Sequence, residues 1–203
     1  MSWRTLFLKN SAAIRSGRSA VTTKGISSTS VSNLENIYLI GMMGSGKTVT
    51  GRVLAGFLNY AFVDLDAEIQ KKEGRSIPEI FAASGEACFR DIEASVLDLF
   101  SKKKHQVIAT GGGIVLREEN VQRMKMTGKV VLLQASAQSL WQRVRHSKER
   151  PLLNKPDPLG TLEQILNDRA GFYEKACHFS VLTDGKIADD VASEIQELLR
   201  AEA

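Results

Sequence analysis

The sequence predicts a three-layer α/β fold, with helices on both faces of a five-stranded parallel sheet. Two observations support this prediction. From residue 36 onward, short apolar runs alternate with longer segments of helical spacing, which is typical of repeated strand–helix–strand units. In addition, the first apolar run leads into "GMMGSGKT", a glycine-rich motif of the kind that joins a strand to a helix and binds phosphate.

Five short segments are predicted as strands because they are apolar and are followed by small, polar or acidic residues. In an open α/β sheet, ligands bind at the carboxyl ends of the strands, so the residues after these segments are the candidates for a site. The predicted strands are 37–40, 61–63, 106–109, 129–133 and 179–182.

Helices are predicted where apolar residues recur three or four positions apart. The helix over 86–103 follows "SIPE" at residues 76–79, which has the pattern of a capping box with proline in the first turn. Its buried face is expected to carry Phe89, Ile92, Val96, Leu99 and Phe100. The other predicted helices are 47–58, 118–126, 137–146, 161–175 and 188–201.

The segment 148–160, "KERPLLNKPDPLG", is predicted to be a mobile surface loop, since it holds three of the four prolines of the chain. Arg150 lies near its start. An arginine on a closing lid can stabilise charge on a transferring phosphoryl group. A solvated surface arginine is the alternative, and it is the more frequent environment of this residue type.

The charge distribution argues against nucleic-acid binding. The formal net charge is +4, but residues 1–30 contain five basic side chains and no acidic one, which leaves −1 for residues 31–203. The apolar run at residues 6–8 is far too short for a signal-peptide core or a membrane span. We expect residues 1–35 to be a disordered or targeting extension and residues 36–203 to be the folded domain.

The compartment is predicted from the cysteines and from this extension. Cys88 and Cys177 are the two cysteines, and neither they nor the three scattered histidines have metal-binding or redox spacing. This pattern indicates a reduced intracellular compartment and no structural metal. We expect a cytoplasmic protein, with a plastid as the alternative if residues 1–35 are a transit peptide.

The glycine-rich motif runs from Gly41 to Thr48 and matches G-x-x-x-x-G-K-[ST] without a mismatch. Gly44 and Gly46 allow backbone N–H groups to face phosphates, and Lys47 reaches the β and γ phosphate oxygens. The Thr48 hydroxyl is offered to Mg²⁺. A predicted strand precedes the motif and a predicted helix follows it, so we expect this loop to bind a nucleoside triphosphate.

The second strand runs into "FVDLD", which places Asp64 and Asp66 two positions apart. In an extended chain both carboxylates would point to one side of the ligand edge. One would then hold the metal through water and the other would orient an acceptor hydroxyl. A strand-exit turn or a helix N-cap is the alternative explanation of the pair.

Three further features are candidates for an acceptor site. Arg90 and Glu93 are three positions apart on one helix and can form an ion pair, although a surface salt bridge is the alternative. The glycines at 111–113 follow the third strand, where bare backbone can approach a ligand closely or simply form a turn. Arg169 can hold a carboxylate with two hydrogen bonds, or it can be a solvated surface residue.

Taken together and in this order, the motifs of residues 36–200 resemble those of the shikimate kinases. They are G-x-x-x-x-G-K-T, D-x-D, F-R-x-x-E, G-G-G, R-P-L-L and R-x-x-x-Y-x-x-A. The resemblance implies a nucleoside-monophosphate-kinase-like P-loop fold with a lid, a monomer, and transfer of the ATP γ-phosphate to the 3-hydroxyl of shikimate with Mg²⁺ as cofactor.

The resemblance also implies roles at the ATP site. Lys47 would neutralise phosphate charge, Thr48 would bind Mg²⁺, and Asp64 would assist the metal through water. Arg150 would be the lid arginine on ATP, and Arg143 would pack against adenine. The segment lining the ATP phosphates would be Gly44, Ser45, Gly46, Lys47, Thr48 and Val49.

At the acceptor site, Asp66 would bind the shikimate hydroxyls and orient or deprotonate the attacking one. Arg90, supported by Glu93, and Arg169 would hold the shikimate carboxylate, and the Gly112 backbone would meet the ring. Asp66, Lys47 and Arg150 are therefore the expected catalytic residues. The chain departs from the family at Gln70, where Glu is frequent, and at Gly171, where Pro is usual; neither position is expected to touch a substrate.

Other functions explain the sequence less well. The segment 154–157, "NKPD", fits the guanine-recognition pattern of GTPases but does not follow an apolar strand. Gluconate kinases and nucleotide kinases share the phosphate loop, yet they do not account for the ordered set of acceptor motifs. A non-catalytic nucleotide-binding relative is disfavoured because Lys47, Asp66, Arg90 and Arg169 are all present.

Overall fold

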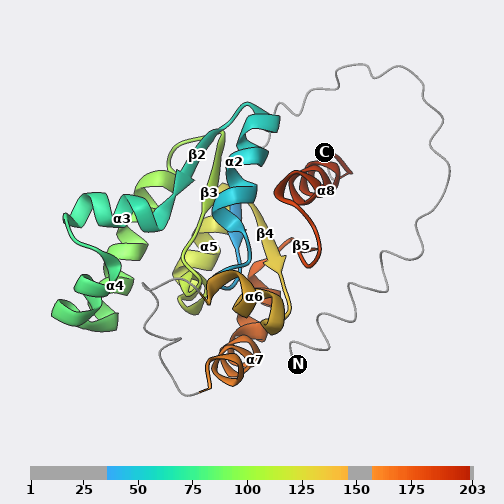
Figure 1. Cartoon of the computed structure of the whole chain (residues 1–203). Coiled ribbons are helices and arrows are strands. Elements are labelled where there is room, and N and C mark those ends of the chain that lie inside the picture. Colours follow the sequence, from blue (N-terminus) through green and yellow to red (C-terminus); the bar gives the residue numbers. More distant parts are fainter. Residues whose placement is uncertain (1–35, 146–156, 202–203) are drawn as a thin grey trace, which may run out of the picture.

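The computed structural model describes residues 36–145 and 157–201. Within them, five strands form one parallel sheet in the order β2-β3-β1-β4-β5 (Figure 1). β1 is central, so the phosphate motif that follows it opens at the middle of the carboxyl edge of the sheet. All five predicted strands are confirmed, each to within one residue at either end. They are β1 (Asn36–Ile40), β2 (Ala61–Asp64), β3 (Gln106–Ala109), β4 (Gly128–Gln134) and β5 (Phe179–Leu182).

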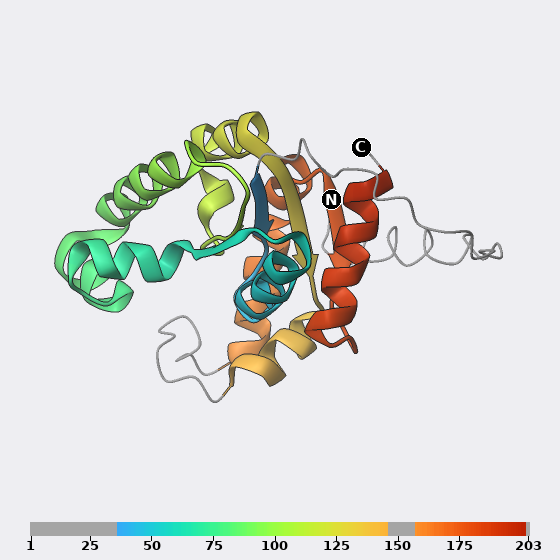
Figure 2. The same ribbon diagram turned by 90° about the horizontal axis from the view of Figure 1, so that it is seen from above.

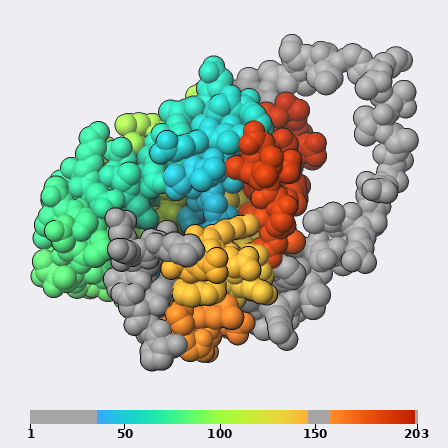
Figure 3. All heavy atoms as spheres, viewed as in Figure 1, coloured from blue at the N-terminus to red at the C-terminus, as the bar shows by residue number. Residues whose placement is uncertain are grey.

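Alternate side chains of β1 enter two hydrophobic cores, one on each face of the sheet. Ile37 and Leu39 share one core with α2 (Lys47–Leu58) and α8 (Ala188–Ala201), which lie side by side in Figure 3. Tyr38 and Ile40 enter the other core. Strands covered on both faces are mostly hydrophobic, as residues 37–40 of β1 are. The helices of the second core include α4 (Ile77–Ser101), α5 (Glu118–Thr127) and α7 (Pro158–Ala176).

The predicted three-layer α/β architecture is therefore confirmed. The predicted extension at residues 1–35 and the part of the predicted lid that contains Arg150 lie outside the described residues. In the part of the chain that the structure covers, every helix is too short or too polar to cross a membrane.

The structure contains a helix that the sequence prediction missed. α3 (Leu65–Glu73) begins directly after β2 because the Asp64 carboxylate caps it, accepting from the N–H groups of Asp66 at 3.1 Å and Ala67 at 3.3 Å. It ends at Gly74, whose φ of 65° favours glycine. Together with the first part of α4, α3 projects beyond the sheet (Figure 2).

Helix α4 starts earlier than predicted. The capping box of Ser76 and Glu79 is confirmed, and α4 begins at Ile77 rather than at residue 86. It consists of two segments joined at Gly85, where φ is 76° and ψ is 175°. Leu99 was expected on the buried face but is 55% exposed, because the buried stripe of the second segment runs through its neighbours Val96 and Phe100 instead.

Two further boundaries were predicted wrongly. α7 begins at Pro158 rather than at residue 161, because the Asp157 carboxylate caps it through the N–H of Gly160 at 2.9 Å. The predicted loop therefore ends at residue 157. α6 (Ala137–Val144) ends two residues before the predicted end at 146.

The fit of α2 against the sheet can be tested at its glycines. A Cβ atom at Gly51 would come 2.6 Å from the ring of Phe62, so we expect Gly51→Ala to overpack this contact. The free energy of unfolding should fall by roughly 1–3 kcal/mol. Gly56→Ala is the matched control on the same helix, because a Cβ there meets nothing within 4 Å. It should raise stability by about 0.5–1 kcal/mol. Urea denaturation measures both changes, and equal effects of one sign would contradict this packing.

Candidate active site

The phosphate motif forms a loop between β1 and α2. Gly44 has φ 78° and Gly46 has φ 96°, the left-handed geometry that lets successive N–H groups turn to one side. The Lys47 ammonium lies over the loop, where it donates to the carbonyl oxygens of Gly41 at 2.9 Å and Met42 at 3.0 Å. The loop and the amino end of α2 thus form the phosphate cradle that the motif predicts.

Two neighbours of Lys47 differ in what they present to this cradle. Ser45 is buried, and its Oγ has no hydrogen-bond partner within residues 36–145 and 157–201. A buried hydroxyl of this kind is suited to a ligand oxygen. The Val49 side chain is 61% exposed on the first turn of α2, so only its backbone can belong to the cradle.

A hydroxyl and a carboxylate meet at the start of α2. The Thr48 hydroxyl donates to Oδ2 of Asp64 at 2.8 Å, while Oδ1 of Asp64 caps α3. Such oxygen atoms are the hard ligands that Mg²⁺ binds, with water and substrate phosphates filling the remaining positions. The described residues contain no cluster of three or more His, Cys, Asp or Glu that would hold a metal unaided. The donor set fits a Mg²⁺ ion that is held jointly with a nucleotide.

The two aspartates do not point to one side, as the extended chain was expected to make them do. Helix α3 starts between them, so Asp64 faces Thr48 while Asp66 turns towards the glycines after β3. Oδ1 of Asp66 lies 3.0 Å from the position that a Cβ atom on Gly111 would occupy. The alternative explanation, a helix N-cap, is correct for Asp64, and its capping role coexists with its contact to the phosphate loop.

The predicted ion pair of Arg90 and Glu93 is confirmed. Nη1 of Arg90 lies 2.8 Å from Oε2 of Glu93, whose side chain is 1% exposed. Nη2 of Arg90 lies 3.1 Å from Oε1 of Glu86, which the sequence analysis did not single out. The spacing of Glu86 four residues before Arg90 was the available signal. The guanidinium is thereby held from two directions on α4.

The glycines at 111–113 pack directly against this ion pair. A Cβ on Gly111 would come 2.7 Å from Oε1 of Glu93, and a Cβ on Gly113 would overlap the Arg90 guanidinium. The backbone turns here into a short 3₁₀ helix, η2 (Ile114–Leu116). Close approach of bare backbone, rather than a simple turn, explains the glycines at 111 and 113.

Burial controls the protonation of the acidic group in this cluster. It raises the pKa of the Glu93 carboxyl above its usual range, and the positive charge of Arg90 offsets this only in part. The nearby charge of Asp66 raises that pKa further. Burial also opposes the charge on Arg90, but the carboxylates of Glu93 and Glu86 outweigh it and raise the pKa of the guanidinium. The pair is therefore most stable with Arg90 fully charged.

Arg169 reaches the same glycines from the other side. It lies on α7 and donates from Nη1 to the Gly112 carbonyl oxygen at 3.2 Å. Tyr173, one turn further along α7, donates to the same oxygen at 2.6 Å. Tyr173 belongs to the R-x-x-x-Y pattern but received no predicted role; its spacing of four residues from Arg169 was the signal. The structure thus brings together Asp66, Arg90, Glu93, Gly112 and Arg169.

Arg143 lies at a different edge of the phosphate loop. Its guanidinium donates to the Thr183 carbonyl at 2.8 Å, to the Thr183 hydroxyl at 2.9 Å and to the Gly44 carbonyl at 3.2 Å. It therefore ties α6 both to the phosphate loop and to the segment after β5. Its predicted packing against adenine stays a prediction, as does the lid role of Arg150, which lies outside the described residues.

The two departures from the family pattern lie away from this cluster. Gln70 is exposed on α3. Helix α7 continues through Gly171, and a Cβ there would meet nothing within 4 Å. Neither position alters the placement of the site residues.

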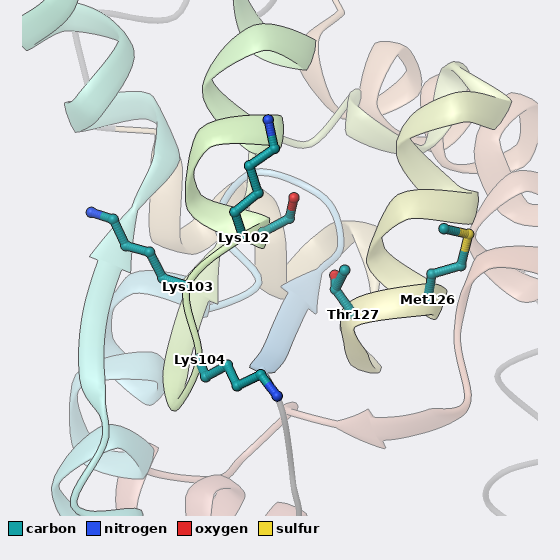
Figure 4. Close-up of a pocket in the computed structure, with 6 residues that line it drawn as sticks. Lys102, Lys103, Lys104, Met126 and Thr127 are labelled. Atoms are coloured by element: carbon teal, nitrogen blue, oxygen red, sulfur yellow. The ribbon is translucent and has the colours of Figure 1, made fainter.

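A shallow pocket lies at the opposite, amino end of the sheet, lined by Ser101, Lys102, Lys103, Lys104, Met126 and Thr127 (Figure 4). The three lysine side chains point in different directions. Lys102 pairs with Asp98 at 2.7 Å, and the Lys103 ammonium lies 4.6 Å from the centre of the Phe100 ring. Because the positive charges do not converge, this pocket is not an anion site comparable to the one at the carboxyl edge.

Comparisons of the sequence with known proteins agree with this geometry. A family model described as "Shikimate kinase" matches residues 43–200. The shikimate kinase of Symbiobacterium thermophilum is 46% identical over 167 residues, which are 81% of this chain and 96% of that protein. The shikimate kinase of Thermodesulfovibrio yellowstonii is 44% identical over 162 residues, which are 80% of this chain and 93% of that protein.

Comparisons of the structure give the same result. Shikimate kinase from Acinetobacter baumannii, solved in complex with shikimate, superposes with a TM-score of 0.81 at 39% identity. The match covers 84% of this chain and 95% of that one. A gluconokinase from Sinorhizobium meliloti has a TM-score of 0.53 at 18% identity over 83% of this chain and 93% of that one, so this likeness concerns the fold alone.

The buried Glu93 carboxyl generates a prediction about stability and pH. Its pKa is higher in the folded than in the unfolded chain, so its contribution to stability is largest below the unfolded pKa and declines as the pH rises through the folded value. In Glu93→Gln this decline is absent. We expect the free energy of unfolding of the wild type, relative to the variant, to fall as the pH rises above the ordinary pKa of a glutamate. Urea denaturation across this range measures it, and a relative gain of the wild type with rising pH would refute the assignment.

Proposed function

The chain belongs to the shikimate kinase family, and on that premise we propose which side chains bind the two substrates and which promote transfer of the phosphoryl group. Its activity is the ATP-dependent phosphorylation of shikimate at the 3-hydroxyl, which gives 3-phosphoshikimate and ADP. The observation that carries the proposal is the convergence of Asp66, Arg90 and Arg169 on the glycines at 111–113, beside the phosphate loop.

The donor site is the loop at the centre of the carboxyl edge. We assign the ATP phosphates to the N–H groups from Gly44 to Val49, including Ser45 and Gly46 between them. Lys47 neutralises negative charge on the transferring phosphoryl group. In the transition state this charge spreads over the phosphoryl oxygens, and its stabilisation accounts for much of the rate enhancement in phosphoryl transfer. The contacts of Lys47 with two carbonyl oxygens of the loop support this role, since they hold the ammonium over the cradle.

Mg²⁺ is the cofactor that this donor set fits. Thr48 would hold it directly and Asp64 through water, and their 2.8 Å contact supports a shared site. When bound, the ion offsets negative charge on the β and γ phosphates.

Arginines complete the proposed ATP site. The bonds of Arg143 to Gly44 and Thr183 place its guanidinium between the phosphate loop and the segment after β5, which supports contact with adenine. Arg150 is proposed to reach ATP from the lid. The alternative in which residues 154–157 recognise guanine is disfavoured, because it requires the Asp157 carboxylate, which instead caps α7.

Two arginines are proposed to bind the shikimate carboxylate. Arg90 comes from α4 and Arg169 from α7, and both are adjacent to the glycine backbone at 111–113. Each guanidinium can donate two parallel hydrogen bonds to a carboxylate. Glu93 holds Arg90 in position without reaching the acceptor itself, because its side chain is only 1% exposed. The Gly112 backbone would lie against the shikimate ring.

Asp66 is the proposed residue that orients and deprotonates the attacking hydroxyl. An ionised carboxylate only accepts hydrogen bonds, so it can bind a hydroxyl and take its proton. Glu93 is the other carboxylate of the cluster, but it is buried and paired with Arg90. Asp66 is half-buried and its Oδ1 faces Gly111, which supports its selection.

The proposal extends to the organisation of the chain. We assign residues 36–203 to the kinase domain and residues 1–35 to a disordered or targeting extension. The formal charge of −1 over residues 31–203 supports a small-molecule kinase that binds neither nucleic acid nor membrane. We propose that it acts as a monomer in the cytoplasm, with a plastid as the alternative compartment.

Asp66→Asn tests the role in proton transfer. The amide is nearly isosteric but cannot accept the proton, so we expect kcat to fall by roughly 10²- to 10⁴-fold. The affinity for ATP should change less than twofold, measured by titration with a non-hydrolysable ATP analogue. Asp91→Asn on the exposed side of α4 is the control. Unchanged turnover of Asp66→Asn would remove this carboxylate from the mechanism.

Arg169→Ala tests the carboxylate clamp. Loss of charge-assisted hydrogen bonds should raise the KM for shikimate by roughly 10- to 100-fold. The KM for ATP should stay within twofold, because α7 does not contribute to the phosphate cradle. Arg200→Ala on the exposed surface of α8 is the control for removal of one positive charge. Steady-state kinetics with each substrate varied in turn measures both KM values, and equal effects on the two would count against the carboxylate clamp.

A further inference from the structure

One carbonyl oxygen in the site receives hydrogen bonds from two side chains of the same helix. The Gly112 oxygen accepts from the Tyr173 hydroxyl at 2.6 Å and from Nη1 of Arg169 at 3.2 Å. A carbonyl has two lone pairs, so the two donors can be bound at once. The donors lie four residues apart on α7 and therefore share one face of it. The oxygen thus fixes the distance between the glycine loop and this face.

The loop that carries this oxygen is confined on its other sides. The Glu93 carboxylate blocks the Cβ position of Gly111, and the Arg90 guanidinium blocks that of Gly113. The corresponding position on Gly112 faces the phosphate loop, with the Gly41 oxygen 3.5 Å and the Met43 nitrogen 3.6 Å away. The three glycines are therefore the segment that α4, α7 and the phosphate loop all contact.

Tyr173 lies behind the site. Its side chain is 0% exposed and belongs to the hydrophobic core beneath the sheet, so it does not contact the acceptor. Glycine has no side chain to hold its own backbone in place, and a loop of three glycines depends on outside contacts for its conformation. The Tyr173 hydroxyl is the shorter of the two contacts at the Gly112 oxygen.

We propose that Tyr173 is a positioning residue for the acceptor: through the Gly112 carbonyl it fixes the backbone of the glycine loop and the direction in which Arg169 presents its guanidinium. The inference rests on the proposed function, in which Arg169 binds the shikimate carboxylate and the Gly112 backbone meets the ring. It adds a residue that acts without touching either substrate.

The chemistry of Tyr173 suits this task. Burial raises the pKa of its phenol to about 12, so the hydroxyl remains a donor throughout the pH range in which the enzyme folds. Removing the hydroxyl leaves the hydrogen bond from Arg169 to the Gly112 oxygen in place. The guanidinium is then drawn further towards the backbone, at the expense of its contact with the acceptor.

Tyr173→Phe tests the proposal, with Tyr38→Phe as the matched control. Tyr38 is also 0% exposed, but its hydroxyl bonds Thr127 at 2.7 Å, near the amino end of β4. Each variant loses one buried hydroxyl group and its hydrogen bonds, so both melting temperatures should fall by roughly 2–4 °C. Only Tyr173→Phe should raise the KM for shikimate, by roughly 3- to 10-fold, with the KM for ATP within twofold. A change in shikimate KM no larger than that of Tyr38→Phe would overturn the proposal.

The double variant Arg169→Ala/Tyr173→Phe shows whether Tyr173 acts through Arg169. If it does, Tyr173→Phe should raise the shikimate KM less than twofold in the Arg169→Ala background. Multiplication of the two single effects would overturn the claim that Tyr173 directs Arg169. If Arg169→Ala alone leaves the shikimate KM unchanged, the proposed function of Arg169 fails, and this inference fails with it. A large effect of Arg169→Ala beside no effect of Tyr173→Phe refutes the inference alone.

Discussion

The steric constraint at the glycines 111–113 is the feature on which the candidate active site depends. Side chains of α4 occupy the places that a Cβ would take at Gly111 and Gly113, and side chains of α7 hold the oxygen of Gly112. A side chain at 111 would displace the Glu93 carboxylate, and one at 113 would displace the Arg90 guanidinium. Ordering three glycines costs conformational entropy. In return, the ion pair on α4 and Arg169 on α7 can approach the same small acceptor.

The charges around these glycines are ordered by how deeply they are buried. Glu93 is the deepest, and its charge is tolerated because it neutralises Arg90, with Glu86 as a second, exposed partner. This pairing leaves the guanidinium ordered rather than free, so less rotamer entropy is lost when an anion binds. Asp66 is left as the more accessible carboxylate of the cluster. Burial thus separates a structural carboxylate from one that is available for chemistry.

The sequence predicts those features that follow from local patterns and fails where side chains from separate elements decide the outcome. All five strands and the phosphate loop were predicted, because a parallel sheet needs apolar runs and the loop needs glycines at fixed positions. The geometry of Asp64 and Asp66 was wrong because Asp64 caps a helix that lacked a strong hydrophobic pattern. Its acidic first turn, its basic last turn and Gly74 were usable signals. Tyr173 had no signal of its own beyond spacing, since its role arises from a contact with residue 112 on another element.

The two substrates are assigned to different parts of the fold, one built mainly from backbone and the other mainly from side chains. The ATP cradle is backbone at the end of a central strand, and it depends on left-handed glycines and the amino end of α2. The acceptor site is made of Asp66 on α3 and of side chains on α4 and α7, two helices that pack against the sheet from one face and both reach the glycines at 111–113. A change in the packing of α7 moves Arg169 and Tyr173 together, because they lie one turn apart on a continuous helix. Acceptor recognition is therefore coupled to the core beneath the sheet, whereas phosphate recognition depends on backbone conformation at the sheet edge.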